Sequence, residues 1–223
     1  MAVHVQALSI VDAIADDIRA NLFNGRLRSD TQLTEAEVAA NYEVARPTAK
    51  AAIEKLVSEG LLLRSTHKTA RVPAVGPDEV RDLYFARLCI ESEVVRRLAE
   101  RGNLPDSSRL ANDEVSALEP GAGMEVAEHV IRFHLGLVSA LGSPRLTRLF
   151  GMLMGEMRLC MAQMNYQRLL QAPVIADEHK VIIREIAAGN PDGAVAALEA
   201  HLRQAEKRIL PTLESMAAKA RES

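Results

Sequence analysis

The sequence predicts a mainly α-helical protein made of two parts. Residues 1–75 show a helix, a capped second helix, a tight turn, a third helix and a short hairpin. Residues 76–223 show almost only leucine-, alanine- and methionine-rich helical periodicity, after a break at Gly76-Pro77-Asp78. We therefore expect an N-terminal winged helix-turn-helix followed by a C-terminal all-helical bundle.

The first helix is expected in QALSIVDAIADDIRANLFNG, where Asn24 and Gly25 stop it. Its apolar residues recur at helical spacing, so they should cover the back of the next two helices: Leu8, Val11, Ile14, Ile18 and Leu22.

The next two helices are predicted by their termini. Thr34 and Glu37 have the spacing of a capping box, so a short helix should run from Thr34 to about Asn41, a residue that tolerates the left-handed conformation that ends a helix. Pro47 suits the first turn of the third helix, and Gly60 ends it. One face of that helix is apolar (Ala49, Ala52, Ile53, Leu56 and Val57) and the other is polar (Arg46, Lys50, Glu54 and Lys55).

Two short strands are expected after Gly60, in LLLR and ARVPAV, with residues 65–69 as the tip of a wing. This plan places the third helix in a DNA major groove, so we expect binding to double-stranded operator DNA. The alternative is a winged helix that contacts only another protein.

The net charge of the whole chain does not indicate DNA binding, but the charge of one segment does. The net charge is −3, and residues 1–75 hold nine basic and nine acidic residues. Residues 43–71 hold six basic and three acidic residues, however, and a homodimer would present this excess twice.

The composition predicts a cytoplasmic protein. No run of eighteen uncharged apolar residues and no signal-peptide pattern is present, so no membrane partner is expected. Cys89 and Cys160 show no paired framework and are expected to be buried thiols in a reducing compartment.

The bundle should contain helices at about 78–101, 106–118, 124–141, 144–170, 174–189 and 191–218. The sequence places His134, His179 and His201 on the apolar faces of three of them. Neutral imidazole is the commonest ligand of zinc and related metals, so the three side chains could share one divalent ion. Each could instead be a hydrogen-bonded core residue.

Both parts together resemble the GntR family of bacterial transcription regulators, in the FadR-like branch whose sensing domain is called FCD. The family pattern SRTPVREAL followed by EGL is matched by ARPTAKAAIEKLVSEGL, with Ala45 and Ala51 as departures and a wing that lacks the usual glycine. The resemblance implies a set of DNA contacts: Thr34, Arg46, Thr48, Lys50, His67 and Lys68.

The metal motif of the family places an Asp four residues before a His, a second His in an EH pair and a third His 22 residues later. This chain has His134, His179 and His201 at that spacing, but Val130 stands at the Asp position. The resemblance implies a three-histidine site for zinc or nickel with one position open to water or an anion. The alternative is a metal-free pocket.

The resemblance also implies a small carboxylate effector. Arg87 is the expected clamp, with an ion pair to Glu91 as the alternative, and Arg158 and Asn165 are further candidates for the pocket lining. The run GMLMGEMRLCMAQM is expected to form an adaptable core or a dimer face.

Two other functions fit part of the pattern. A metal-dependent hydrolase needs a general base beside the metal, and Glu178, next to His179, should point to a different face, so we expect no enzyme. A ligand-free architectural DNA-binding dimer would leave the buried histidines without a purpose.

Overall fold

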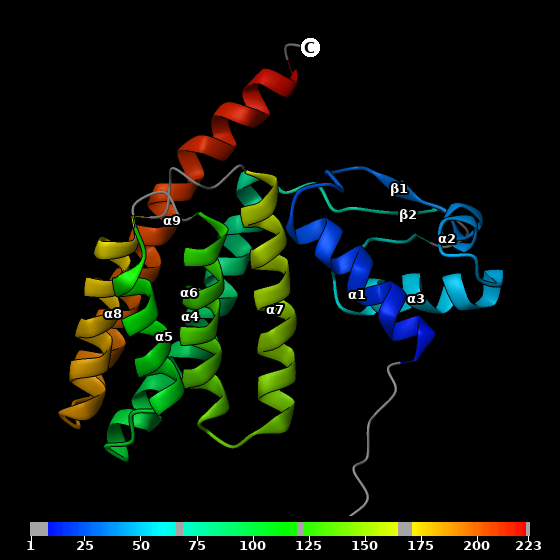
Figure 1. Ribbon diagram of the computed structural model, residues 1–223. Coiled ribbons are helices and arrows are strands. Elements are labelled where there is room, and N and C mark those ends of the chain that lie inside the picture. The colour runs from blue at the N-terminus through cyan, green and yellow to red at the C-terminus, as the bar shows by residue number, and fades with distance from the viewer. Residues whose placement is uncertain (1–8, 66–68, 120–122, 165–170, 222–223) are drawn as a thin grey trace, which may run out of the picture. The chain divides into compact units, whose positions relative to one another are not determined.

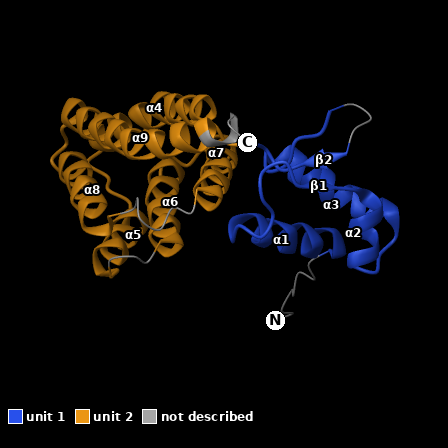
Figure 2. Cartoon of the chain, turned by 90° about the horizontal axis from the view of Figure 1, so that it is seen from above, with its two compact units in different colours: residues 1–74 blue, residues 75–223 orange. Residues whose placement is uncertain are grey.

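A computed structural model describes residues 9–65, 69–119, 123–164 and 171–221. The chain forms two compact units, Met1–Ala74 and Val75–Ser223, which are coloured separately in Figure 2. The expectation of a mainly α-helical protein is confirmed. Within the described ranges, no helix is both long and apolar enough to cross a membrane.

The first unit contains α1 (Ile10–Phe23), α2 (Glu35–Asn41) and α3 (Arg46–Ser58), together with the short strands β1 (Gln32–Leu33) and β2 (Ala70–Arg71) (Figure 1). The three helices pack together through α3, which contacts both α1 and α2. The centre of the unit is formed by apolar side chains with at most 3% exposure: Ile14, Ile18, Leu22, Ala49, Ala52, Ile53 and Leu56.

Helix α2 begins and ends as predicted. The Thr34 hydroxyl accepts from the backbone N–H of Glu37, and the Glu37 carboxylate accepts from the N–H of Thr34, which completes a capping box. The left-handed conformation that Asn41 would tolerate falls on another residue of the turn. Asn41 is still helical, and Glu43 has the positive φ, 53°, because the turn begins one residue after the C-cap Tyr42.

The wing differs from its prediction in one strand. Leu63 and Arg71 exchange two backbone hydrogen bonds of 2.8 and 2.9 Å, as a hairpin requires. Arg71 also lies opposite Gln32, because β1 pairs antiparallel with β2. Strand β1 was not predicted from the sequence, because two residues are too few to show alternation.

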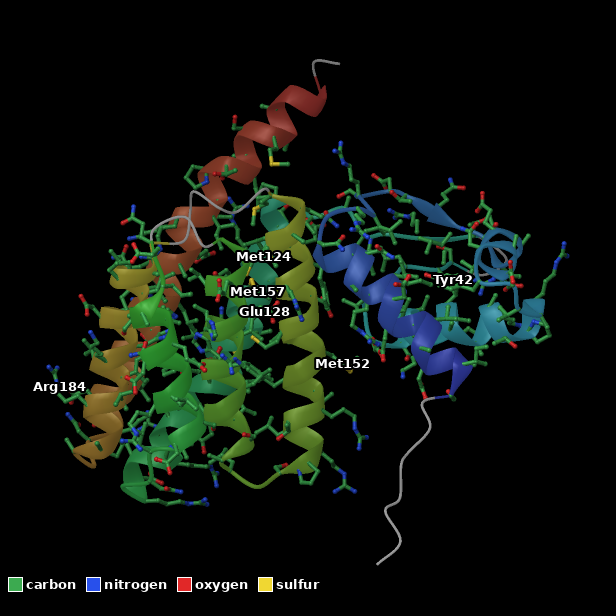
Figure 3. All side chains as sticks on the ribbon, viewed as in Figure 1. Tyr42, Met124, Glu128, Met152, Met157 and Arg184 are labelled. Carbon is green, nitrogen blue, oxygen red and sulfur yellow. The ribbon has the colours of Figure 1, made fainter. Side chains whose placement is uncertain are left out.

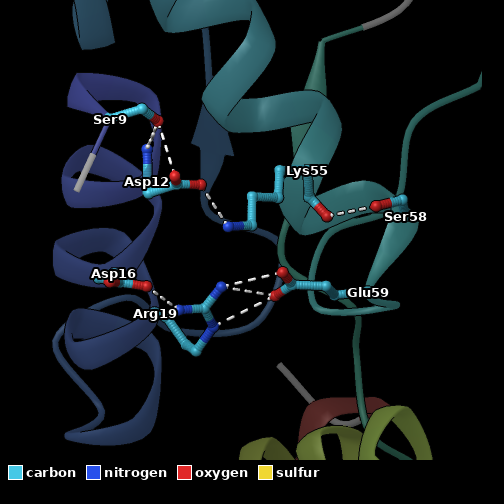
Figure 4. A network of polar contacts seen from close by, with 7 residues as sticks. All are labelled: Ser9, Asp12, Asp16, Arg19, Lys55, Ser58 and Glu59. Carbon is cyan, nitrogen blue, oxygen red and sulfur yellow. Dashed lines mark hydrogen bonds and ion pairs between the residues drawn. The ribbon is translucent and has the colours of Figure 1, made fainter. Parts of the chain in front are cut away.

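Two ion pairs join α1 to α3, as Figure 4 shows. Lys55 Nζ lies 2.6 Å from the Asp12 carboxylate, and the Arg19 guanidinium donates to both oxygens of Glu59. These contacts join α1 to the C-terminal end of α3.

The second unit is a bundle of helices whose bounds lie within a few residues of those expected, except at the end of α7. They are α4 (Pro77–Glu100), α5 (Asp106–Ala117), α6 (Met124–Ser139), α7 (Pro144–Gln163), α8 (Ala172–Ala187) and α9 (Pro191–Arg221). The long helix expected over 144–170 ends at Gln163, and residues 165–170 lie outside the described part. Helix α4 packs along α9, α5 along α6, and α8 against both α5 and α9.

Candidate functional site

The exposed surface of α3 carries part of the expected DNA contacts. Arg46 and Lys50 are exposed at the start of the helix, one turn apart, and Thr48 is half-buried between them. Lys50 Nζ is 3.7 Å from Glu54, and both side chains are more than half exposed, so a phosphate could compete for this cation.

A cavity of about 430 Å³ brings Thr34 and Arg46 together with Arg64 at the base of the wing. Arg64 donates to Glu35 at 2.7 Å, and this hydrogen bond is the main reason that the pKa of Glu35 is lowered. The Thr34 hydroxyl also donates to Glu37, so it is engaged in the helix cap. Arg64 was missed from sequence, and the predicted contacts His67 and Lys68 lie outside the described residues.

The bundle brings His134, His179 and His201 together in its interior. They come from α6, α8 and α9 and are 0%, 0% and 3% exposed. Each offers a ring nitrogen to a group whose members all lie within 4.8 Å of one another. The ring of His179 also stacks on Phe133, with centroids 3.8 Å apart, so its orientation is held by packing.

Each histidine uses Nδ1 to contact an oxygen behind it. His134 meets the Glu91 carboxylate, His179 meets the Asn112 side-chain oxygen at 3.1 Å, and His201 meets the Glu178 carboxylate at 2.8 Å. An oxygen that only accepts requires the imidazole to donate, so these contacts place the proton on Nδ1 of all three rings. The same arrangement orients metal-binding histidines in proteins.

The three Nε2 atoms are therefore acceptors without a matching donor. His134 Nε2 and His201 Nε2 face each other at 3.3 Å, and His179 Nε2 is buried and has no hydrogen-bond partner among the described residues. Two nitrogens bound to one tetrahedral zinc ion at about 2.0–2.1 Å would be about 3.4 Å apart. The donor set thus fits a divalent ion, and a buried cation would satisfy all three lone pairs.

Burial keeps these imidazoles neutral. It lowers the pKa of His134 to about 4 against the opposing effect of Glu91, and it lowers the pKa of His179 well below the usual value. Burial also lowers the pKa of His201, although the hydrogen bond to Glu178 opposes it. Neutral rings are the form that binds metals, so little proton competition is expected near pH 7.

Two arginines neutralise the carboxylates behind the histidines. Burial would raise the pKa of Glu91, but His134 and Arg87 outweigh it and bring this pKa to about 2. Glu178 likewise has a pKa of about 2, because hydrogen bonds from His201 and Arg208 outweigh its burial. Arg208 binds both oxygens of Glu178, at 2.8 and 2.9 Å. The two anions are thus each matched by one cation.

The predicted effector residues have different surroundings. Arg87 is 3% exposed and donates to Glu91 at 2.9 Å, which is the alternative expected from the sequence. Its Nη2 is buried and has no partner within the ranges that the structure describes. Arg158 of α7 forms an ion pair with Glu128 of α6, which Figure 3 labels. Asn165 lies outside the described residues.

Several residues of the site were missed from sequence. Asn112 is 1% exposed on α5 and shares a buried stripe with Ser108, Ala111 and Val115, so its spacing was the available signal. The roles of Glu91 and Glu178 behind His134 and His201 carry no such signal, because each pair is joined only by the packing of two helices. Glu178 is held by His201 and Arg208, so it is not free to act as the general base that a hydrolase needs.

In the metal-free protein, stability should fall as the pH drops from about 6.5 towards 4. The unfolded chain protonates its histidines at their ordinary pKa, whereas folded His134 resists protonation to about pH 4. Through His134 alone, the free energy of unfolding should fall by on the order of 3 kcal/mol across that pH range. Glu91 and Glu178 lose their contributions only below their ordinary pKa of 4.5, so they do not cancel the effect above it.

Urea unfolding of chelator-treated protein at pH 7.5, 6.5 and 5.5 measures this loss. The variant His129→Gln is the control, because this histidine lies on α6 outside the cluster and should leave the pH dependence intact. An unfolding free energy that stays constant from pH 7.5 to 5.5 would contradict the expectation.

A winged helix joined to a helical bundle is the domain arrangement of a class of protein, the DNA-binding transcription regulators. The family comparison agrees. Residues 10–72 match the bacterial regulatory proteins of the gntR family, and residues 82–204 match the FCD domain. The chain belongs to the GntR family and carries an FCD domain, consistent with the FadR-like branch. It is a DNA-binding transcription regulator and not an enzyme.

Curated relatives carry the same assignment. The chain is 26% identical over 214 residues to a candidate regulatory protein of the L-lactate dehydrogenase operon of Escherichia coli (strain K12), which covers 86% of this chain and 83% of the relative. It is also 26% identical over 170 residues to the HTH-type transcriptional regulator BphR of Paraburkholderia xenovorans (strain LB400), covering 72% of this chain and 67% of the relative.

Solved structures share the fold. A candidate GntR transcriptional regulator from Rhodococcus sp. RHA1 superposes with a TM-score of 0.77 at 23% identity, covering 91% of this chain and 98% of that one. The Zn²⁺-bound FCD domain of TM0439 has a TM-score of 0.52 at 19% identity, and its metal-free form has 0.54 at 20%. Each form covers 64% of this chain and 99% of the FCD domain.

Proposed function

We propose that this regulator binds a palindromic operator in the cytoplasm as a homodimer, and that its bundle senses a small carboxylate through a divalent metal ion. In this proposal residues 1–75 are the DNA-binding domain, and residues 76–223 form the sensing domain. The proposed DNA contacts are Thr34, Arg46, Thr48, Lys50, His67 and Lys68. One observation carries the sensing proposal: three buried imidazoles bring ring nitrogens within 4.8 Å of one another, and in the described part of the chain His179 Nε2 has no hydrogen-bond partner.

The proposed ligands of the metal, zinc or nickel, are His134, His179 and His201. A bound divalent ion would supply a positive charge that attracts a carboxylate oxygen. All three protein ligands are neutral, and Val130 supplies no carboxylate at the fourth position. Because Glu91 and Glu178 are already matched by Arg87 and Arg208, the charge of the ion would be balanced by an anion from outside the chain.

A small carboxylate fits this charge balance. Arg87 is proposed as its second clamp, because Nη2 is buried and without a partner beside the cluster, and a guanidinium binds carboxylates well. Arg158 and Asn165 are proposed for the lining of the pocket. The relative named for the L-lactate dehydrogenase operon supports a small carboxylate as the class of effector.

A metal-free sensor of the same fold is the second candidate. It is favoured by Val130, which is 7% exposed and apolar where a fourth ligand would stand. The FCD domain of TM0439 has been solved both with zinc and without metal. In this alternative the histidines line a polar pocket that binds the carboxylate directly.

A thermal-shift screen of small carboxylates, with and without added zinc, tests the proposal. A carboxylate at about 100 times its Kd should raise the melting temperature by about 5 °C or more, because binding to the folded state adds about 2.7 kcal/mol. We expect the shift only in the presence of zinc. An equal shift in chelator would favour the metal-free sensor, and no shift with any carboxylate would contradict this class of effector.

A further inference from the structure

A cavity of about 400 Å³ lies where the second half of α4 meets the start of α7. Among the described residues that line it, none belongs to the histidine cluster. Small-molecule sites in proteins have volumes of about 300–1,000 Å³, so this cavity is large enough for a ligand of its own.

Part of the cavity lining is apolar. It is formed by four aliphatic side chains of α4, the end of α6 and α7: Ile90, Val94, Leu141 and Leu146. Val94 belongs to the core of the bundle, and the other three are half-buried against that core. A ligand with an apolar group would cover these side chains and remove their exposed surface from water.

The polar part of the lining carries an unmatched positive charge. Glu93 accepts a hydrogen bond of 2.6 Å from Arg97 Nε, so these two side chains neutralise each other. Arg101, the C-cap residue of α4, also lines the cavity and is exposed. In the described ranges Arg101 has no ion-pair partner, whereas Arg96 on the same helix pairs with Asp192.

The first turn of α7 adds a second positive charge beside the cavity. Ser143 and Leu146 line the cavity, and the exposed Arg145 lies between them in the sequence. No acidic residue is present in this first turn, and Arg145 has no ion-pair partner within the part of the chain that the structure describes. A cation at the N-terminus of a helix is unfavourable, because that end already carries a partial positive charge. An anion bound beside Arg145 would remove this conflict.

We propose that the cavity binds a phosphate monoester that carries a small apolar group, as a second ligand of the bundle. Arg101 and Arg145 match the two negative charges of the phosphate, which guanidinium groups bind with paired hydrogen bonds. The apolar lining covers the organic group. This inference does not rest on the proposed function, because the cavity uses neither the histidines nor a metal ion.

Cys89 provides a reporter for the site. Cys89 lines the cavity and is exposed, against the expectation of a buried thiol. Cys160 is 0% exposed, and burial raises the pKa of its thiol to about 12, so only Cys89 should react with a neutral maleimide.

The rate of this maleimide reaction measures binding, in chelator-treated protein at one fixed protein concentration. Phenyl phosphate is the probe, and it should slow the reaction until the site is saturated. Inorganic phosphate lacks the apolar group and phenol lacks the charge, so each should need a roughly tenfold higher concentration for the same protection. Equal protection by inorganic phosphate, or no protection by phenyl phosphate, would overturn the proposal.

Two arginine variants test the charged part of the site. Arg101→Ala and Arg145→Ala should each raise the Kd of phenyl phosphate, measured by calorimetry, by about tenfold. The matched control is Arg184→Ala: Arg184 is 70% exposed on α8, where Figure 3 labels it, and its variant should bind as the parent does. Unchanged binding in both cavity variants would overturn the proposal.

Vesicles that contain phosphatidic acid test the other source of this chemistry, a lipid head group. The protein should stay in solution when the vesicles are sedimented, because the proposed ligand is a small soluble ester. Sedimentation of the protein with the vesicles that phenyl phosphate reverses would overturn this choice of ligand.

Discussion

Replacing His201 with alanine is expected to remove the bound metal and the response to effector. His201 Nε2 lies 3.3 Å from His134 Nε2, so its loss removes one of three ligands and leaves the Glu178 carboxylate without its imidazole partner. Loss of a residue that only supports a ligand costs 10–100-fold in affinity, so loss of the ligand should cost roughly 100-fold or more. Metal content after dialysis, and competition with a chromogenic chelator, measure the change.

The parent protein should carry about one ion per chain, and a chelator should lower its melting temperature. The control is His129→Ala, a histidine of the same helix as His134 that pairs with Glu114 outside the cluster and should keep the metal. Basal DNA binding should survive in His201→Ala, since the first unit has its own core. A parent protein that contains no metal and takes none up would refute the metal part of the proposed function.

The variant Val130→Asp should act in the opposite direction. It places a carboxylate one turn before His134, so metal binding should tighten and depend less on an added carboxylate. Without metal the same variant should melt at a lower temperature than the parent, because a buried charge then has no partner. The Asp variant should therefore bind metal more tightly than the parent but be less stable than the parent when metal is absent. A substitution that is only tolerated at position 130 would not tighten metal binding.

Replacing Arg46 with alanine should weaken specific operator binding by roughly 1–3 kcal/mol if its guanidinium contacts a base. Arg46 is exposed in the first turn of α3 and borders the cavity that includes Arg64. The variant should also relax the preference at one symmetric pair of operator positions. Selection of operator sequences from a random pool, followed by titration at several salt concentrations, measures both effects.

Arg28→Ala is the matched control, because Arg28 is exposed in the same unit and lies outside the three helices. It should leave sequence preference unchanged. If Arg46 contacts only a phosphate, its variant should lower the affinity for all DNA sequences equally. The slope of the logarithm of the binding constant against the logarithm of the salt concentration should then fall by about one. A folded Arg46→Ala protein that binds its operator as tightly as the parent would exclude both roles.

Local signals predicted most of the fold. The capping box at Thr34, the proline in the first turn of α3 and the breaks between the bundle helices act within a few residues, so they can be found in the sequence. The failures share a cause. Strand β1 and the positive φ of Glu43 depend on pairing and on turn geometry that involve residues beyond the local pattern.

By itself the sequence determined that His134, His179 and His201 face the interior, because helical spacing fixes which side of a helix is apolar. Only the tertiary structure decided which oxygen stands behind each imidazole. Asn112, Glu91 and Glu178 reach the three rings from other helices, and these contacts place the protons on Nδ1 and turn the Nε2 lone pairs towards one point. Periodicity sets the face of one helix, whereas the partner of a buried ring depends on how two helices pack, which no spacing along the chain records.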